Sequence, residues 1–321
     1  MIKFDFISEG EKVLSIYTDS QKVIKKIIYN SDTITKTIPV KIEYVEETDN
    51  IAENENILVY KNCSKTSVDI DVKNNISFLS MPEDNLFFPD IVYLAIGMIA
   101  NKLQKEQKYF IQSSVVKNEK GNSIMFLGDP NSGKTTLASK LILTGNWSLV
   151  SNDNVIVKLE KDKLVTIAGT KSVQMRYGAI KLFFPQLLDK INTPKEIDTR
   201  DEWDIKIYVN DIFKEIGVKY SDESVVSDIY IINTVKNGDI FIREREAIDR
   251  NLLIYEHLTK QIRSNRYALT SFDRPMPSFE QEEYMQARYD MAKIISNSIN
   301  IYETKGSVDN IIENIKAKNG R

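Results

Sequence analysis

The feature that most constrains this chain is a segment of eight residues between an apolar strand and a helix. Residues 128–135 have the sequence GDPNSGKT, which matches the Walker A pattern G-x-x-x-x-G-K-[ST] in full. The preceding segment Ser123–Leu127 is apolar and typical of a buried strand, and a helix is predicted from Gly133 to about Thr144. This order of strand, loop and helix predicts a P-loop that binds a nucleoside triphosphate.

Each fixed position of the loop has a physical reason. Side chains at Gly128 and Gly133 would obstruct a backbone that must turn its N–H groups toward phosphate oxygens. Lys134 is expected to place its charge between the β- and γ-phosphates, and the Thr135 hydroxyl to bind Mg²⁺. No N-K-x-D pattern for guanine follows downstream, so ATP is the predicted nucleotide. The predicted nucleotide contacts are Gly128, Asp129, Pro130, Asn131, Ser132, Gly133, Lys134, Thr135 and Thr136.

A carboxylate from a neighbouring strand is expected near this loop, because P-loop enzymes use one to complete the magnesium site. Asp153 follows the predicted strand Trp147–Val150 and comes 19 residues after Lys134. We expect this strand to return beside the strand that leads into the loop and to bring Asp153 to the γ-phosphate. The alternative is an ordinary turn, which Asn152-Asp153-Asn154 suits on composition.

Composition argues against several other kinds of site. Cys63 is the only cysteine and His257 the only histidine, which disfavours disulfides, Cys/His metal clusters and Ser-His-Asp triads. The formal net charge is −3 without a basic block, so we expect no nucleic-acid partner. The longest apolar stretch, Ile91–Ala100, is about half of a bilayer span, and no signal-peptide core precedes it. We expect a cytoplasmic protein without a membrane partner, and a homo-oligomer is left open.

The remaining pattern predicts an α/β fold in two parts. We expect a smaller N-terminal α/β domain over residues 1–88, followed over residues 89–321 by a P-loop kinase domain with a mixed sheet flanked by helices. A helix is predicted over Ile91–Leu103, with Asp90 as its N-cap. The strands predicted for the first part are Val13–Tyr17, Thr33–Val45, Ile57–Tyr60 and Val68–Leu79.

In the second part, a hairpin is predicted from Tyr109–Val116 and Ser123–Leu127, and another from Val155–Leu159 and Leu164–Ile167. The last forty or so residues are predicted to be mostly helical. Gln281–Ile299 and Val308–Lys318 carry the apolar stripes that indicate these helices.

Three segments of the chain resemble the HPr kinase-like family, bacterial P-loop kinases whose fold is related to phosphoenolpyruvate carboxykinase. The first, Phe110–Leu137, contains the strand, turn and strand that enter the loop. The second, Leu149–Val155 (LVSNDNV), is similar to the family's L-V-A-D-D-x-V segment. The third, Gly169–Leu187, is similar to a downstream stretch that carries an Arg near a Gly beside the active site. The resemblance covers residues 110–190 and weakens beyond them.

The resemblance implies an ATP- and Mg²⁺-dependent kinase. Asp153 falls on the second acid of the family's pair, and Arg176 on the downstream arginine, which would neutralise charge on the transferred phosphoryl group. Three departures imply a divergent member rather than a true HPr kinase. Asn152 stands in place of the first acid, residues 112–114 (QSS) lack a histidine, and Thr136 replaces the Glu of true HPr kinases.

We therefore expect transfer of the γ-phosphoryl group of ATP to a hydroxyl of a small metabolite or of a peptide Ser/Thr. The predicted catalytic residues are Lys134, Asp153 and Arg176, and the predicted metal ligands are Thr135 and Asp153. Two alternatives stay open: a nucleotide-binding regulatory or scaffold protein with little turnover, suggested by Asn152, and an ATPase coupled to a partner.

Other residues fit ordinary structural roles at least as well as functional ones. Arg176 suits an exposed strand as well as it suits an active site. We expect Phe183-Phe184-Pro185 to pack in a core and His257 to be structural within a helix. Asp273-Arg274-Pro275 is expected to form an exposed turn rather than a lid.

Overall fold

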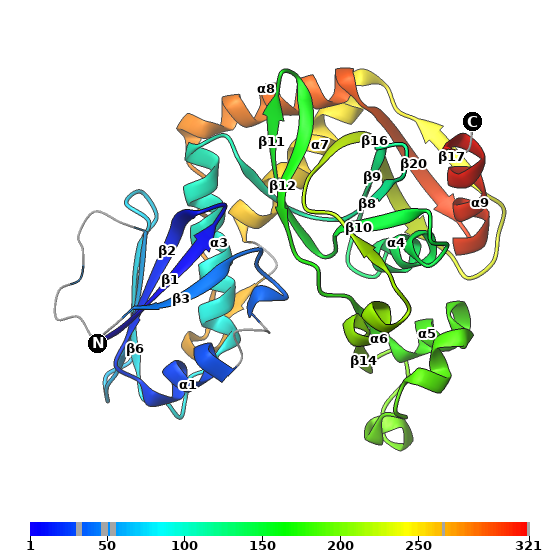
Figure 1. Ribbon diagram of the computed structural model, residues 1–321. Helices are drawn as coiled ribbons and strands as arrows, with labels where there is room; N and C mark the ends of the chain where they lie inside the picture. Colours follow the sequence, from blue (N-terminus) through cyan, green and yellow to red (C-terminus); the bar gives the residue numbers. More distant parts are fainter. Residues whose placement is uncertain (30–33, 46–50, 52–55, 265–266, 320–321) are drawn as a thin grey trace. The chain divides into compact units, whose positions relative to one another are not determined.

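The computed structural model describes all of the 321-residue chain except residues 30–33, 46–50, 52–55, 265–266 and 320–321 (Figure 1). The chain forms two compact units, each assembled from segments that are far apart in sequence. The first unit contains residues 1–111, 156–168 and 251–296, and the second contains 112–155, 169–250 and 297–321. The domain boundary predicted after residue 88 is a statement about which segments fold independently. It stays a prediction.

The first unit contains a six-stranded sheet in the order β3-β1-β2-β4-β6-β5. β2, β4 and β6 pair in parallel, whereas β1 pairs with β2 and β3, and β5 with β6, in antiparallel fashion. The helix α3 packs against β2. The strands are β1 (Ile2–Ser8), β2 (Glu11–Thr18), β3 (Lys41–Val45), β4 (Ile57–Asn62), β5 (Ser67–Asp71) and β6 (Ile76–Met81). The helices that lie wholly or mostly in this unit are α1 (Gln21–Tyr29), α3 (Pro89–Lys105), α7 (Ala247–Arg263) and α8 (Glu282–Ser298).

Two strand predictions in this unit are wrong. The expected strand Thr33–Val45 is a strand only over Lys41–Val45, because Pro39 lacks the N–H that a ladder requires. Its first residue lies outside the described part of the chain. The expected strand Val68–Leu79 is two antiparallel strands joined by a turn in which Asn75 has a φ of 57°. Asparagine tolerates this left-handed conformation, which ends the first strand and allows the chain to reverse.

The expected N-cap of α3 is also wrong. The capping position is Phe88, and Pro89 opens the helix with a fixed φ that suits its first turn. Asp90 is fully buried in that turn, and its carboxylate oxygens accept hydrogen bonds from the backbone N–H groups of Thr270 (3.0 Å) and Ser271 (2.7 Å). The carboxylate therefore satisfies the backbone of another segment instead of its own helix.

The second unit contains a mixed sheet, as predicted, whose strands follow the order β15-β10-β8-β9-β16-β20-β17. β9, β16 and β20 run parallel to one another, whereas β8 is antiparallel to both of its neighbours, β10 and β9. The sheet strands are β8 (Ser114–Asn118), β9 (Ser123–Leu127), β10 (Trp147–Ser151), β15 (Lys219–Tyr220), β16 (Ser224–Thr234), β17 (Phe241–Glu244) and β20 (Asn300–Gly306). The expectation of a mostly helical C-terminus is confirmed, because α8 and α9 (Val308–Asn319) cover most of the last forty residues and β20 occupies the short stretch between them in sequence.

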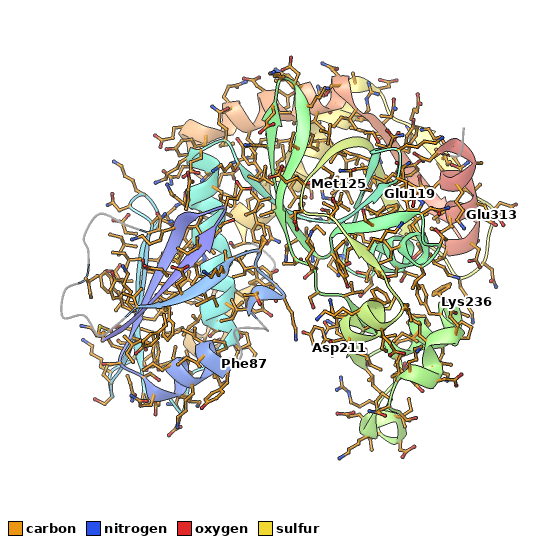
Figure 2. The ribbon with its side chains drawn as sticks, in the orientation of Figure 1. Phe87, Glu119, Met125, Asp211, Lys236 and Glu313 are labelled. Carbon is orange, nitrogen blue, oxygen red and sulfur yellow. The ribbon has the colours of Figure 1, made fainter. Side chains whose placement is uncertain are left out.

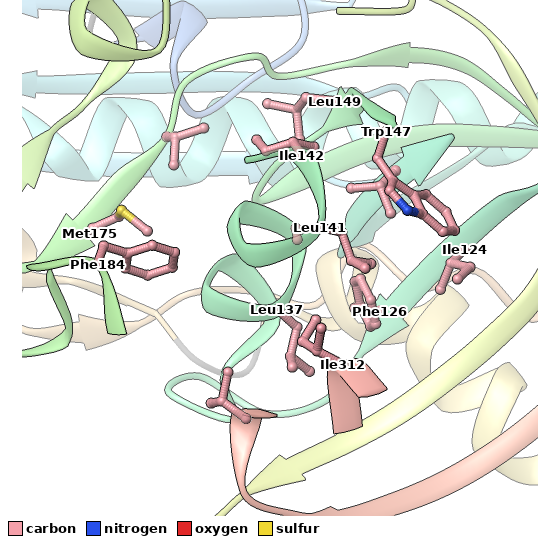
Figure 3. Packing of buried hydrophobic residues seen from close by; sticks show 14 of the residues in the cluster. Ile124, Phe126, Leu137, Leu141, Ile142, Trp147, Leu149, Met175, Phe184 and Ile312 are labelled. Carbon is pink, nitrogen blue, oxygen red and sulfur yellow. The ribbon is translucent and has the colours of Figure 1, made fainter. Parts of the chain in front are cut away.

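The core of the second unit is built around α4 (Lys134–Ile142), which packs against α9 (Val308–Asn319). Leu137 and Leu141 of α4 lie beside Phe126 of β9 and Ile312 of α9 (Figure 3). Phe184 is fully buried in the same cluster, which confirms the core interpretation of that aromatic. This packing holds the start of α4, and with it the end of the glycine-rich loop, against the sheet.

Side chains of the β8–β9 hairpin are mostly buried along the strands and exposed in the turn. Met125 of β9 lies inside the unit, whereas Glu119 lies in the turn between β8 and β9 (Figure 2). These two strands form the predicted hairpin, but the strand expected over Tyr109–Val116 is divided into β7 (Tyr109–Gln112) and β8. The described chain contains further strands and helices, of which the two seven-residue strands at 154–160 and 163–169 are hydrogen-bonded neighbours. These further elements are β7, β11 (Asn154–Glu160), β12 (Lys163–Gly169), β13 (Gln174–Arg176), α5 (Tyr177–Phe183), η1 (Pro185–Lys190), η2 (Lys195–Asp198), β14 (Lys206–Tyr208), α6 (Asn210–Glu215), β18 (Ala268–Leu269), η3 (Thr270–Phe272) and β19 (Arg274–Pro275).

Candidate active site

The 128–135 loop connects the carboxyl end of β9 to the first turn of α4. Gly128 and Gly133 have φ angles of 142° and 99°, and Gly133 is the N-cap of the helix. Asn131, between them, has a φ of 68°. Such angles are unfavourable for residues with a Cβ, and asparagine is among the few that tolerate them. The loop therefore turns back sharply onto the helix that follows it.

The two glycines also have no space for a side chain. A Cβ on Gly128 would lie 2.7 Å from the carbonyl oxygen of Ile232, and a Cβ on Gly133 would lie 2.4 Å from Cγ2 of Thr234. Both contacts come from β16, the parallel neighbour of β9. Packing against β16 thus makes glycine necessary at both positions, in addition to the backbone angles.

Lys134 is almost completely buried at the start of α4, with 7% of its surface exposed. Its Nζ donates hydrogen bonds to the carbonyl oxygens of Gly128 (3.0 Å) and Asp129 (2.8 Å), so the ammonium group lies inside the turn of the loop. Ser132 is 8% exposed, and its buried Oγ has no hydrogen-bond partner within the described structure. A buried donor of this kind is uncommon and points to a ligand or water in the loop.

Asp153 lies in the turn between β10 and β11, with a φ of 75°. Its carbonyl oxygen accepts a hydrogen bond from the backbone N–H of Ser113 (2.9 Å), and Nε2 of Gln112 donates to its Oδ1 at 3.3 Å. The expectation that the strand before Asp153 lies beside β9 is wrong, because β8 separates β10 from β9. β8 precedes β9 in the chain and pairs with it as a hairpin, so β8 occupies the edge of β9 at which β10 was expected.

Asn152 is 3% exposed and uses both ends of its amide. Its Nδ2 donates to the carbonyl oxygen of Ser172 (2.9 Å), and its Oδ1 accepts from the Ser114 hydroxyl (2.9 Å). Its backbone N–H donates to the carbonyl oxygen of Thr170 (2.7 Å), whose hydroxyl donates to the carbonyl oxygen of Asn152. A carboxylate at position 152 would place an oxygen against the Ser172 carbonyl. The position therefore suits an amide and not the acid that the resemblance would place there.

Lys171 holds the strand that leads into this turn. Its Nζ donates to the carbonyl oxygen of Val150 at 2.5 Å and also to that of Ser221, and it lies 3.7 Å from the carboxylate of Asp222. Burial lowers the pKa of the Lys171 ammonium group, and the nearby Asp222 charge opposes this effect. The lysine thus fixes the end of β10, three residues before Asp153.

Arg176 contacts the glycine-rich loop directly. Its Nη2 donates to Oδ1 of Asn131 at 2.8 Å, its Nη1 donates to the carbonyl oxygen of Trp203, and Nη1 lies 3.6 Å from the carboxylate of Asp204. This contact distinguishes Arg176 from a surface residue without partners, although its part in a reaction stays a prediction.

The strand pair β13–β14 carries Arg176 and a tyrosine, Tyr208, that is sensitive to the charge of Asp153. Arg176 ends β13, and Tyr208 of β14 lies opposite Gln174 two residues away. The pKa of the Tyr208 hydroxyl is raised, mainly by burial and further by the negative charge of Asp153. Arg176, which contacts the loop through Asn131, and Tyr208 therefore lie on the same strand pair.

Sequence reasoning missed the residues that hold these groups in place. Thr234 and Lys171 support the loop and the turn, but each is more than 15 residues from the group it supports, and neither belongs to a recognisable pattern. The strand character of Asp228–Thr234 was a usable signal for β16. His257 and the turn at Asp273–Pro275 lie in the first unit. The histidine is buried on α7 and the turn is exposed, as expected.

Among the described residues, no cluster of three or more His, Cys, Asp or Glu side chains could hold a metal ion. Mg²⁺ does not require such a cluster when phosphate oxygens and water supply most of its ligands. In the described chain, none of the helices has the length and apolar character that crossing a membrane requires.

Comparisons with known proteins give a distant structural likeness. No protein-family model matches the chain, and no curated protein does. Among solved structures, the Hpr(Ser) kinase/phosphatase from Coxiella burnetii aligns with 66% of this chain and 95% of its own, at 14% sequence identity and a TM-score of 0.31.

Proposed function

We propose that this protein is an ATP-dependent phosphotransferase that transfers the γ-phosphoryl group to a hydroxyl. The observation that carries the proposal is the 128–135 loop, in which Gly128 and Gly133 have no room for a Cβ and Lys134 is buried at the first turn of α4. A loop of this shape turns backbone N–H groups toward one point at a helix N-terminus, which favours a bound phosphate.

The residues of the loop fit a triphosphate. The unpartnered Oγ of Ser132 supplies a donor, and Nζ of Lys134 would exchange the carbonyl oxygens of Gly128 and Asp129 for phosphate oxygens. Thr135, one residue further along α4, would offer its hydroxyl to Mg²⁺. Bound Mg²⁺ would neutralise phosphate charge, and the carboxylate of Asp153 would be one of its ligands.

In the proposed reaction, the acceptor hydroxyl oxygen forms a bond to the γ-phosphorus while the bond to the β,γ-bridging oxygen breaks, which leaves ADP. Asp153 accepts the hydroxyl proton, and Gln112 orients its carboxylate through the 3.3 Å contact. Lys134 and Arg176 stabilise the negative charge of the transferred group. The contact of Arg176 with Asn131 of the loop supports this role.

The acceptor that we propose is a hydroxylated small molecule or a peptide Ser/Thr in the cytoplasm. A scaffold with little turnover is the second candidate, because Asn152 replaces one acid. The structure of the turn weakens the case for a scaffold. The side chain of Asn152 is hydrogen-bonded to Ser172 and Ser114, whereas Asp153 is partly exposed. A partner-coupled ATPase would use the same loop and release free phosphate.

The test is to incubate the protein with ATP, Mg²⁺ and a pool of metabolites or peptides, and to detect a phosphorylated product by mass spectrometry. The expected result is a product that is absent with Lys134→Ala, because this variant lacks the charge that bridges the phosphates. Lys214→Ala, at an exposed lysine of α6, is the matched control and should behave as the wild type.

Other results would contradict the proposal. Binding of ATP without any release of ADP would favour the scaffold, and release of free phosphate without a labelled acceptor would favour the ATPase. Product formation by Lys134→Ala at the wild-type rate would show that the loop is not the nucleotide site.

A further inference from the structure

β16 extends beyond the end of β9, and its last residues pack against the 128–135 loop. Ile231 of β16 pairs with Leu127, the last residue of β9, so the next three residues of β16 lie alongside the loop. The backbone N–H of Thr234 donates to the carbonyl oxygen of Ser132 at 3.0 Å. This hydrogen bond ties the carboxyl end of β16 to the residue before Gly133.

The side chain of Thr234 fills the space beside Gly133. A Cβ on Gly133 would lie 2.4 Å from Cγ2, 2.5 Å from Oγ1 and 3.0 Å from Cβ of Thr234. Because three atoms of a short, β-branched side chain make this contact, rotation about one bond cannot remove it. The contact leaves the glycine backbone against the threonine with no intervening space.

Thr234 is itself held from its other side. It pairs with Gly306 of β20, and the backbone N–H of the next residue, Val235, donates to the carbonyl oxygen of Gly306 at 3.0 Å. β20 leads directly into α9, which packs against α4. Thr234 is thus fixed between the loop and a strand of the same sheet, and it cannot move away from Gly133 without disturbing that strand.

We propose that Thr234 is a positioning residue of the nucleotide site, and that its packing against Gly133 keeps the loop in the shape that binds phosphate. The proposal rests on the proposed function for the identity of the ligand. The steric contact itself does not depend on that function. It follows that glycine is required at position 133 for two separable reasons, its φ of 99° and the volume that Thr234 occupies.

The first test separates these two reasons by a double-mutant cycle on apparent melting temperature, measured without nucleotide. Gly121→Ala is the matched control, because Gly121 has a φ of 91° and a Cβ there meets nothing within 4 Å. Gly133→Ala should lower the melting temperature more than Gly121→Ala does. Adding Thr234→Ala to Gly133→Ala should recover part of the excess loss, because it removes Cγ2 and Oγ1 and leaves only Cβ at 3.0 Å, although Thr234→Ala alone is destabilising. Additive effects of the two substitutions would overturn the steric part of the proposal.

The second test measures the steady-state constants for ATP in three variants of Thr234. Thr234→Ala should raise the KM for ATP about tenfold with a smaller change in kcat, because the loop binds phosphates in the ground state as well as in the transition state. Thr234→Val keeps the shape of the side chain and should stay close to the wild type, whereas Thr234→Ser loses the methyl group and should resemble Thr234→Ala.

The opposite order, with Thr234→Ser close to the wild type and Thr234→Val impaired, would overturn the positioning role in favour of a direct hydroxyl contact with phosphate. Wild-type KM in Thr234→Ala would overturn it as well. If the wild-type protein itself fails to bind ATP, the proposed function fails, and the melting-temperature cycle still decides whether Thr234 shapes the loop.

Discussion

The 128–135 loop and the turn at Asn152–Asp153 hold their backbones at positive φ by different means. In the loop, Gly128 and Gly133 have angles of 142° and 99°, and β16 fills the space that side chains would need. In the turn, Asp153 has a φ of 75° without being a glycine. Side-chain hydrogen bonds from other segments compensate for its conformation, because Thr170, Ser172 and Ser114 all bind Asn152.

This difference determines how each region responds to substitution. The loop concentrates its proposed chemistry in consecutive residues, so a single change in it acts on the ligand directly. The turn depends on partners about 20 to 40 residues away along the chain. Substitutions at those partners should therefore affect stability first and the position of Asp153 second.

The largest effect in the turn is expected from Asp153→Asn. Asparagine tolerates the same left-handed backbone, so the fold should be retained while the carboxylate is lost. Turnover should fall on the order of a hundredfold, with a smaller loss of ATP affinity because the loop and Lys134 remain. Steady-state kinetics and equilibrium ATP binding measure the two effects, with Asp211→Asn at an exposed site as control. Near-normal turnover would place the essential acid elsewhere.

A moderate effect is expected from Asn152→Asp. The variant removes the donor to the Ser172 carbonyl and leaves a buried acceptor facing another, which should lower the free energy of unfolding by about 1–3 kcal/mol. Burial raises the pKa of such a carboxyl in the folded state. The variant should therefore lose further stability as the pH rises above about 4, the usual pKa of aspartate, because the unfolded chain then releases the proton more readily. Denaturant unfolding at several pH values measures this.

The control for this variant is Asn122→Asp, at an exposed turn position, which should change stability little. A variant Asn152→Asp that is as stable as the wild type at neutral pH would show that the amide of Asn152 is not a structural requirement. The contrast between the loop and the turn would then have to be revised.

The smallest effect is expected from Lys171→Met, measured as a dependence on pH. Burial lowers the pKa of Lys171, so below the usual lysine value of about 10.4 the unfolded chain binds more protons than the folded one. The wild type should therefore gain stability relative to the variant as the pH rises toward that value. The measurement is the difference in apparent melting temperature between the two proteins, because contributions of all other titrating groups are common to both. A difference that shrinks with rising pH would contradict the burial of this amine.

Two errors of sequence interpretation in this protein concern contacts between distant segments, whereas the two wrong strand predictions have local causes at Pro39 and Asn75. Ser123–Leu127 and the helix after the loop follow from local apolar patterning, and both form within two residues of the predicted bounds. Asp90 has the composition of an N-cap, yet its carboxylate binds Thr270 and Ser271, 180 residues further along. The neighbour of β9 was also mistaken, because strand order depends on which segments bury the most surface together.

The sequence by itself determined that a strand, a glycine-rich loop and a helix follow one another at residues 123–142, since these features depend on local conformational preferences and apolar spacing. Tertiary structure alone decided that β16 stands behind the loop, that Arg176 reaches Asn131, and that Asn152 serves as a buried amide. Each of these arrangements joins segments 20 to 100 residues apart. Only packing and hydrogen bonding in the folded chain select such pairs from the many that a sequence permits.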